Sequence, residues 1–414
     1  MTALSGTRPA AAPRSPRARL RDLSDAHRST TIVVGMALAT AVLVLLPKVP
    51  PLSLIQGEAP WLDAFANAGV FVLLAMGLNV VIGMAGLLDL GYAAFFAIGA
   101  YVYAYSNSPF SQTDLPFLPM LLLGAAVAAI FGIALGAPTL RLRGDYLAIM
   151  TLGFGEIVPI VFLNLENWTE GTNGIGGIYR PEALPVIGEF TPLTPFAYFS
   201  VMLVLVTITM ILMYRLQDSR IGRAWNAIRE DELAAAANGI NTVTTKLLAF
   251  ALGATTAGLA GVFNASKLTI VSPDQFYFAV SFTVLAMVIL GGMGNIWGVA
   301  AGAFIVYIFQ IVVLRQLNSI EEGLNIPFLP QVNFIDYQYL LFGLALVLMM
   351  LFRPEGLFPS QRRRRELHVA EDLAPDLGED IDAEPGLAGA LGEAPGSDEL
   401  YGESSGEGDP GSLR

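Results

Sequence analysis

Two carboxylates, Asp89 and Glu156, lie within long apolar stretches of the sequence. An ionisable side chain is costly in lipid, so such a residue usually faces a cavity, a substrate path or a partner group. Glu156 follows "TLGFG", whose glycines, Gly153 and Gly155, are expected to loosen a helix and expose backbone groups to a zwitterion. Asn79 is a third polar side chain in an apolar stretch. These five residues are the candidates for lining a path through a membrane.

Each polar candidate also has a structural explanation. Asp89 is equally placed to cap the helix that follows it. Glu156 is placed to pair with a residue of another helix, and Asn79 to form an interhelical hydrogen bond. The sequence leaves both kinds of explanation open.

Other kinds of chemistry are excluded by the residue types that the chain lacks. It has no cysteine, and its two histidines, His27 and His368, lie in polar tails. Disulfides, thiolate metal sites and a histidine catalyst are therefore excluded. The chain contains no Gly-x-x-x-x-Gly-Lys-Ser/Thr motif and no Gly-Lys pair, so it does not cradle nucleotide phosphates in the usual loop. We expect no catalytic residue, no metal and no cofactor in this chain, and we do not expect it to be an enzyme.

The composition indicates which fold must position these residues. Hydrophobic residues make up 54% of the chain and charged residues 14%, against about 45–50% and about 25% in soluble domains. The apolar residues form stretches close to the roughly 20 residues that a spanning helix needs. These runs are too long for barrel strands, and a backbone in lipid must satisfy its own hydrogen bonds. The sequence therefore predicts an all-α, polytopic helical membrane protein.

Hydropathy over windows of about 19 residues predicts about ten transmembrane helices. They lie near residues 31–47, 63–83, 88–106, 117–139, 145–164, 195–215, 247–266, 278–296, 299–315 and 337–353. The connections "GMAGLLD" at 83–89 and "GGMGNIWG" at 291–298 are very short. We therefore expect some of these segments to be broken or re-entrant.

Basic side chains in the connections are concentrated on one side of the predicted membrane. The N-terminal tail, the fourth and sixth connections and the C-terminal flank fall on that side, and they hold Arg8, Arg14, Arg17, Arg19, Arg21, Arg28, Arg141, Arg143, Arg215, Arg220, Arg223, Arg229, Lys246, Arg353 and Arg362 to Arg365. The opposite connections hold Lys48, Arg180, Lys267 and Arg315. The positive-inside rule therefore places both termini in the cytoplasm.

The membrane domain is flanked by two polar tails. We expect a basic cytoplasmic arm at 1–30, the membrane domain at 31–358 with its main cytoplasmic loop at 216–246, and a basic flank followed by an acidic tail at 359–414. The net charge of −12 belongs to that tail, because residues 1–365 carry 22 basic and 21 acidic side chains. The tail is rich in Gly, Pro, Ser and acid, so we expect it to be disordered. The arginines before it suit anionic lipid headgroups, and nothing in them requires nucleic acid.

The loop "SRIGRAWNAIREDELAAAANGINTVTTK" at 219–246 has the spacing of an amphipathic helix. Ile221, Trp225 and Ile228 fall on one helical face, and Gly239 stands where a helix would end in a left-handed residue. We expect a single helix along the cytoplasmic surface. It either binds lipid headgroups through Trp225 and its arginines or docks into a groove of a soluble partner.

The same loop resembles the EAA loop of ABC importer permeases, in which Glu-Ala-Ala, three residues and Gly belong to a helix that couples to the ATPase subunit. The register that preserves the glycine reads Leu233-Ala234-Ala235-x-x-x-Gly239, and Glu232 stands one position early. The resemblance implies an ATPase-coupling set of Arg223, Trp225, Glu232, Ala234, Ala235 and Gly239.

Five segments, in order along the chain, resemble LivM-type permeases of branched-chain amino-acid ABC importers. They are "GLNVVIGMAGLLDLGYAAFFAIGAY" (77–101), "LRLRGDYLAIMTLGFGEIV" (140–158), "TNGIGGI" (172–178), "SRIGRAWNAIREDELAAAANGIN" (219–241) and "LGGMGNIWGVAAGA" (290–303). The resemblance implies a permease subunit in the bacterial cytoplasmic (inner) membrane. It also implies a second homologous, LivH-like permease, two ATPase subunits that bind ATP and Mg²⁺, and a periplasmic or lipid-anchored binding protein.

Two other functions stay open at this stage. The same machine could carry urea or short amides, because related permeases serve these solutes. An ion-coupled secondary transporter would instead use Asp89 and Glu156 as its coupling carboxylates.

Overall fold

The structure is a computed structural model of the whole chain, and it describes residues 28–45, 58–139, 144–183, 185, 188–191, 195–313, 337–353 and 356–358. The chain divides into two units, Met1–Ser360 and Gln361–Arg414. Most of the predicted N-terminal arm, Arg141 and Arg143, the arginines at 362–365 and the acidic tail lie outside the described residues.

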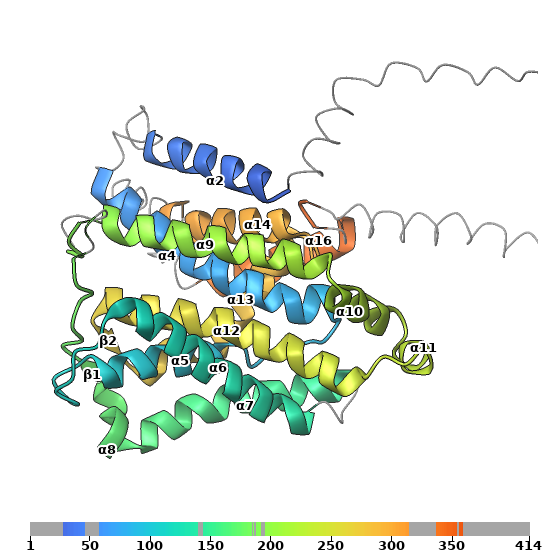
Figure 1. The fold of residues 1–414 in the computed structure, drawn as a ribbon, viewed down its shortest axis with the longest axis horizontal. Helices are drawn as coiled ribbons and strands as arrows, with labels where there is room; N and C mark the ends of the chain where they lie inside the picture. The colour runs from blue at the N-terminus through green and yellow to red at the C-terminus, as the bar shows by residue number, and fades with distance from the viewer. Residues whose placement is uncertain are drawn as a thin grey trace, which may run out of the picture. The chain divides into compact units, whose positions relative to one another are not determined.

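The described part of the chain is helical, apart from one pair of very short strands (Figure 1). The longer helices are α2 (Arg28–Leu45), α4 (Glu58–Leu78), α5 (Ala93–Ser106), α6 (Phe117–Thr139), α7 (Asp145–Asn164), α9 (Phe196–Gln217), α10 (Arg220–Glu230), α12 (Thr242–Leu268), α13 (Phe278–Gly291), α14 (Ile296–Ile308) and α16 (Gln338–Phe352). The shorter elements are the π-helical turns η2 (Asn79–Met84) and η5 (Phe309–Val313), the helices α8 (Glu166–Thr169), η3 (Gly171–Asn173), α11 (Glu232–Ala237) and η4 (Pro273–Phe276), and the strands β1 (Ile175–Gly176) and β2 (Ile270–Val271).

Within the described ranges, six helical segments are long and apolar enough to cross a membrane. They are Pro60–Met84, Phe117–Thr139, Asp145–Asn164, Phe196–Gln217, Thr242–Leu268 and Pro273–Gly291. Four shorter apolar helices, Val33–Leu45, Ala93–Ser106, Ile296–Ile311 and Gln338–Phe352, lie at the remaining predicted positions. The polytopic helical fold is thus confirmed, whereas the number of about ten crossings stays a prediction.

Both expected breaks are present. Residues 85–92 are non-helical between η2 and α5, and residues 292–295 are non-helical between α13 and α14. We call these segments the first turn and the second turn. The second turn lies against η2, the helix that leads into the first turn, because the backbone N–H of Gly294 donates to Asn79 Oδ1 at 2.8 Å.

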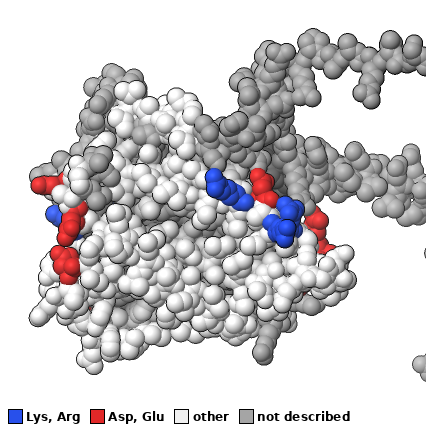
Figure 2. All heavy atoms as spheres, in the orientation of Figure 1, with Lys and Arg blue, Asp and Glu red and all other residues white. Residues whose placement is uncertain are grey.

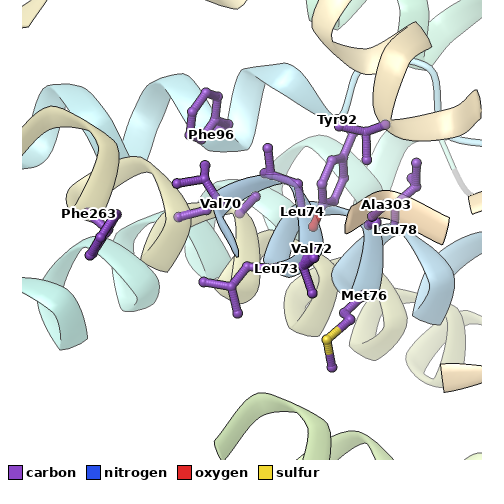
Figure 3. Close-up of a cluster of buried hydrophobic side chains, with 14 of the residues drawn as sticks. Val70, Val72, Leu73, Leu74, Met76, Leu78, Tyr92, Phe96, Phe263 and Ala303 are labelled. Atoms are coloured by element: carbon purple, nitrogen blue, oxygen red, sulfur yellow. The ribbon is translucent and has the colours of Figure 1, made fainter. Parts of the chain in front are cut away.

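The core is built around α4, which is apolar on every side. A helix without a polar face is stable only when other elements surround it, and 89% of the most apolar window of this span is buried. Figure 3 shows its side chains, among them Leu73 and Leu74, packed with Phe263 of α12, Phe96 of α5 and Ala303 of α14. Beside this core, the Tyr92 hydroxyl forms a buried hydrogen bond with α12 by donating to the Gly253 carbonyl at 2.8 Å.

Small residues let α12 approach its neighbours closely. A Cβ on Gly258 would lie 2.6 Å from the carbonyl oxygen of Gly124 in α6, and a Cβ on Gly99 of α5 would lie 2.6 Å from the Cα of Gly258. Such glycine contacts are how helices pack in lipid, where no hydrophobic force drives them together.

The polar connections gather at two opposite ends of the helices (Figure 1). At one end β1 pairs with β2, and the backbone N–H of Tyr179 donates to the Asn107 carbonyl at 2.7 Å. At the other end the first turn, the start of α7 and the α10–α11 segment line one cavity. In the face shown in Figure 2, the Lys, Arg, Asp and Glu side chains lie at these two ends and the surface between them is white. The ends match the two sides predicted from the arginines, and which end faces the cytoplasm stays a prediction.

Candidate functional site

The loop predicted to be one surface helix is two helices. The chain leaves the helical conformation at Asp231, whose φ and ψ are −154° and 112°. Its carboxylate Oδ1 then accepts from the backbone N–H groups of Leu233 at 2.8 Å and Ala234 at 3.0 Å. Aspartate is a preferred N-cap because it satisfies such free N–H groups, so it ends α10 and starts α11. The single-helix prediction is therefore wrong.

The apolar face of α10 packs inward against the start of α12. The side chain of Trp225 is 0% exposed, and its Nε1–H donates to the Thr245 carbonyl at 2.7 Å. Ile228 is also buried, whereas Ile221 is partly exposed. The periodicity thus identified the packed face, but the expectation that Trp225 contacts lipid or a partner protein is wrong. Trp225 fixes the position of α10.

The second helix, α11, is fastened to α12 by charge. Lys246 Nζ lies 2.6 Å from Glu232 Oε1, and the lysine side chain is buried. The displaced acid of the EAA-like pattern therefore has an internal partner. Ala235 is buried beneath the helix, and Gly239 has a φ of +85° where the helix has ended. The predicted glycine stop is confirmed.

The outer face of α11 is exposed. Leu233 is 67% exposed, and Ala234, Ala236 and Gly239 are exposed beside it. Arg223 of α10 is also exposed, with its Nη1 donating to the Asp218 carbonyl at 2.9 Å. We call the exposed residues 233, 234 and 236–239 the α11 ridge. Among the predicted coupling residues, those with surface for another chain are Arg223, Ala234 and Gly239.

Asp89 lies in the first turn and is buried. Its Oδ1 accepts from the Gly91 backbone N–H at 2.9 Å, and its Oδ2 has no hydrogen-bond partner in the described part of the chain. It does not cap α5, because Ser281 Oγ of α13 accepts from the Ala93 backbone N–H at 2.9 Å. A cavity of about 10 Å³ adjoins Asp89 and Thr151, close to the space that one water occupies.

Helix α7 carries the other path candidates and runs unbroken from Asp145 to Asn164. Gly153 and Gly155 therefore do not break the helix. Pro159, four residues after Gly155, has no N–H to donate to the Gly155 carbonyl, so the exposed backbone group expected here stays a prediction. A Cβ on Gly155 would lie 2.7 Å from the Cα of Gly91, so this glycine allows α7 to cross the first turn in close contact. Gly153 has no neighbour within 4 Å of its Cβ position and lies toward the open face of the helix.

Glu156 binds the start of another helix. Its Oε1 accepts from the backbone N–H of Phe278, the first residue of α13, at 3.2 Å. The N-terminus of a helix attracts negative charge, so the carboxylate stabilises a helix that begins opposite the middle of α7.

The first turn packs on α7, with Asp89 beside Thr151 and Gly91 against Gly155. Gly153 lies on the open face of α7 and Glu156 binds α13, so the five path candidates do not form one cluster. Asn79 lies apart, where the second turn meets η2.

From the sequence, Arg229 and Lys246 counted only as charges that orient the chain. Arg229 is exposed, yet its guanidinium donates to the Gly83 carbonyl at 2.6 Å. Its spacing of four residues from Trp225 was the signal that it lies near the packed face.

Comparisons with known proteins agree with this architecture. A family model described as branched-chain amino acid transport system / permease component matches residues 62–350. The chain is 40% identical over 320 residues to the high-affinity branched-chain amino acid transport system permease protein LivM of Salmonella typhimurium, covering 72% of this chain and 70% of that protein. It is 39% identical over 317 residues to LivM of Escherichia coli, covering 72% and 70%.

The permease protein LivH of Escherichia coli is also similar, with 24% identity over 306 residues that cover 69% of this chain and 90% of LivH. No solved structure matches the chain. A family model that spans most of the membrane domain, and relatives of this identity and coverage, show that the chain belongs to the branched-chain amino acid transport permease family.

Proposed function

We propose that this chain is the membrane-spanning permease subunit of an ATP-driven importer for branched-chain or similar amino acids. An external binding protein, periplasmic or lipid-anchored, delivers the substrate. This chain and a second, LivH-like permease form the path, and two ATPase subunits that bind ATP and Mg²⁺ drive it. The proposal rests on the similarity to LivM and LivH, which are permease proteins of branched-chain amino acid transport systems.

The observation that carries the coupling role is the exposed α11 ridge on a fixed base. Trp225 holds α10 to α12 by a buried hydrogen bond, and Glu232 holds α11 to α12 by an ion pair. The ridge itself presents a leucine, small alanines and a left-handed glycine. A helix with small side chains on its outer face allows a groove on another protein to approach closely, as helix-in-groove recognition requires.

The substrate path in this proposal runs along the open face of α7. Exposed apolar side chains there include Tyr146, Ile149, Ile157 and Ile160. Gly153 and Glu156 lie among them on the same helix. In this arrangement the second permease covers the α7 face, and Glu156 with the start of α13 offers polar groups to a zwitterion inside an apolar path.

The orientation follows from the arginines. With the α10–α11 end in the cytoplasm, both termini are cytoplasmic and the β1–β2 end meets the binding protein outside the cytoplasmic membrane of a bacterium. Nucleotide is bound by the partner ATPases in this proposal, and the chain itself carries no cofactor.

Reconstitution tests the proposal. The chain, a second permease, the ATPases and the binding protein are placed in proteoliposomes, and uptake of labelled leucine is followed. We expect uptake to require ATP hydrolysis, and to stop when the ATPases are made catalytically inactive. Uptake that persists with inactive ATPases and follows an imposed ion gradient would identify a secondary transporter instead.

The substrate is tested separately by titrating the cognate binding protein. We expect binding of leucine, isoleucine or valine, and uptake of the same solute. Binding and uptake of urea or short amides, without the amino acids, would keep the ATP-driven machine and replace its cargo.

A further inference from the structure

Arg229 reaches from the end of α10 to the first turn. Its Nη1 donates at 2.6 Å to the carbonyl oxygen of Gly83, which lies in η2 two residues before this turn. The donor is charged, so the bond is stronger than one between neutral groups. It joins a helix of the cytoplasmic loop directly to the broken part of the membrane domain.

The first turn is shaped around the stem of this arginine. Gly86 has a φ of +71°, which favours glycine, and a Cβ there would lie 2.7 Å from Arg229 Cγ and 3.2 Å from Arg229 Cβ. A side chain at this position would therefore strain the backbone and push Arg229 away. The turn and the arginine fit each other.

The second turn lies next to this contact. Gly83 packs on Gly294, whose backbone N–H lies 2.7 Å from the Cβ position of Gly83 and donates to Asn79 Oδ1. Arg229 Nη1 lies 3.7 Å from where a Cβ on Gly294 would be. One side chain of the loop thus contacts η2 and the first turn beside the point where η2 meets the second turn.

The surroundings leave room for this contact to change. A cavity of about 230 Å³ lies between the first turn, the start of α7 and α10–α11, and Arg229, Glu232 and Lys246 line it. Trp225, one helical turn before Arg229, fixes α10 to α12 through the bond to the Thr245 carbonyl. Arg229 lies between this anchor and α11 along the chain, so it is the side chain at the turns that is nearest to α11 on α10.

We propose that Arg229 is the positioning residue through which movement of the α10–α11 segment reaches the first turn (85–92) and the second turn (292–295). It acts through the Gly83 carbonyl and does not touch substrate. The inference rests on the proposed function, because only a partner that moves α11 gives the contact its role. Two sites are coupled when both of them contact the same element and each can shift its position.

The test measures uptake per ATP hydrolysed by the whole transporter in proteoliposomes. We expect Arg229→Gln to lower this ratio about tenfold, the size expected for the loss of one charge-assisted hydrogen bond. ATPase association and thermal stability should stay near those of the unchanged chain, and Arg229→Lys should restore part of the ratio. Arg220→Gln, an exposed change on the same helix, should behave like the unchanged chain.

A second variant separates transmission from general damage. Gly86→Ala should lower the same ratio, and Gly86→Ala combined with Arg229→Gln should be no worse than the stronger single variant, because both remove one contact. Additive losses would overturn the inference, as would an Arg229→Gln transporter that keeps the ratio or loses it only in proportion to lost stability. Failure of the proposed function is seen instead in the unchanged chain, as uptake that does not depend on ATP, and the inference would fall with it.

Discussion

The two ends of the helical bundle are held in different ways. At the β1–β2 end, Lys267 Nζ lies 2.8 Å from Asp63 Oδ1 and donates to Asn67 Oδ1 at 2.6 Å, which joins α12 to α4. At the α10–α11 end, Arg229 and the second turn each meet η2 through a single hydrogen bond beside a cavity of about 230 Å³. Buried Lys246 fastens the surface helix α11 to α12 at this end, whereas buried Lys267 joins two long membrane helices directly at the other. We therefore expect changes at the first end to alter stability, and changes at the second to alter coupling.

The largest effect is expected from Asp63→Leu at the β1–β2 end. The Lys267 side chain is only 8% exposed, so losing its carboxylate leaves a buried ammonium with too few partners. The expected loss is about 2–4 kcal/mol of unfolding free energy. It should be seen as a lower midpoint of thermal unfolding for the purified permease in nanodiscs, with an unchanged uptake per ATP hydrolysed.

Lys267→Met is the matched control for this change. It removes the buried charge, and Asp63, whose side chain is 50% exposed, stays hydrated. The loss should therefore be smaller than for Asp63→Leu. Equal stability of Asp63→Leu and the unchanged chain, or a reduced uptake per ATP at full stability, would contradict the contrast between the ends.

The next effect is expected from Gly239→Val in the α11 ridge. The glycine has a φ of +85°, which costs an ordinary residue about 1–2 kcal/mol and a β-branched one more. The end of α11 should lose its shape and ATPase association should weaken, as measured by pull-down of the ATPases with the permease. Gly188→Val is the control at the other end, since Gly188 has a φ of +95° and equally open surroundings. If both variants bind the ATPases more weakly, the α11 ridge has no special role in ATPase association.

The smallest effect is expected from Asp231→Ala, which removes the N-cap of α11. A cap contributes about 1 kcal/mol, and a helix as short as α11 has little else of its own to hold it. Amide hydrogen exchange should speed up within α11. Asn241→Ala removes the cap of α12, whose 27 residues are packed in the core, and should leave exchange in that helix unchanged. If amide exchange in α11 is equally slow in the Asp231→Ala chain and the unchanged chain, the α11 ridge does not depend on this cap, and the expected difference between the two ends is contradicted.

The sequence predicted the helices and turns well, because these elements depend mainly on residues that are close together in the chain. Hydropathy located the apolar helices, glycine runs located both turns, and the spacing of Trp225 and Ile228 located the packed face of α10. The break at Asp231 was missed although an aspartate two residues before Leu233 is an N-cap signal, since the alanine run that follows suggested one continuous helix.

The contacts that define the candidate site could not be predicted, because they join distant segments. Gly155 was interpreted as a weak point of α7, and its real neighbour is Gly91 on another element. Glu156 binds the start of α13, and Glu232 binds Lys246 of α12. Helical periodicity shows which face is buried, but the identity of the group that faces it depends on how the helices are arranged.

The pairing of β1 with β2 has a consequence for the order in which the protein is made. Ile175 pairs with Val271 and Gly176 with Ile270, so one strand is synthesised before α9 and the other only after α12. The backbone groups of β1 therefore lack their strand partner while two further long helices, α9 and α12, are synthesised. Contacts between distant segments form late, so this end of the molecule can close only after Val271 has been synthesised. A nascent chain arrested before Ile270 would hold most of its helices and yet lack this closure.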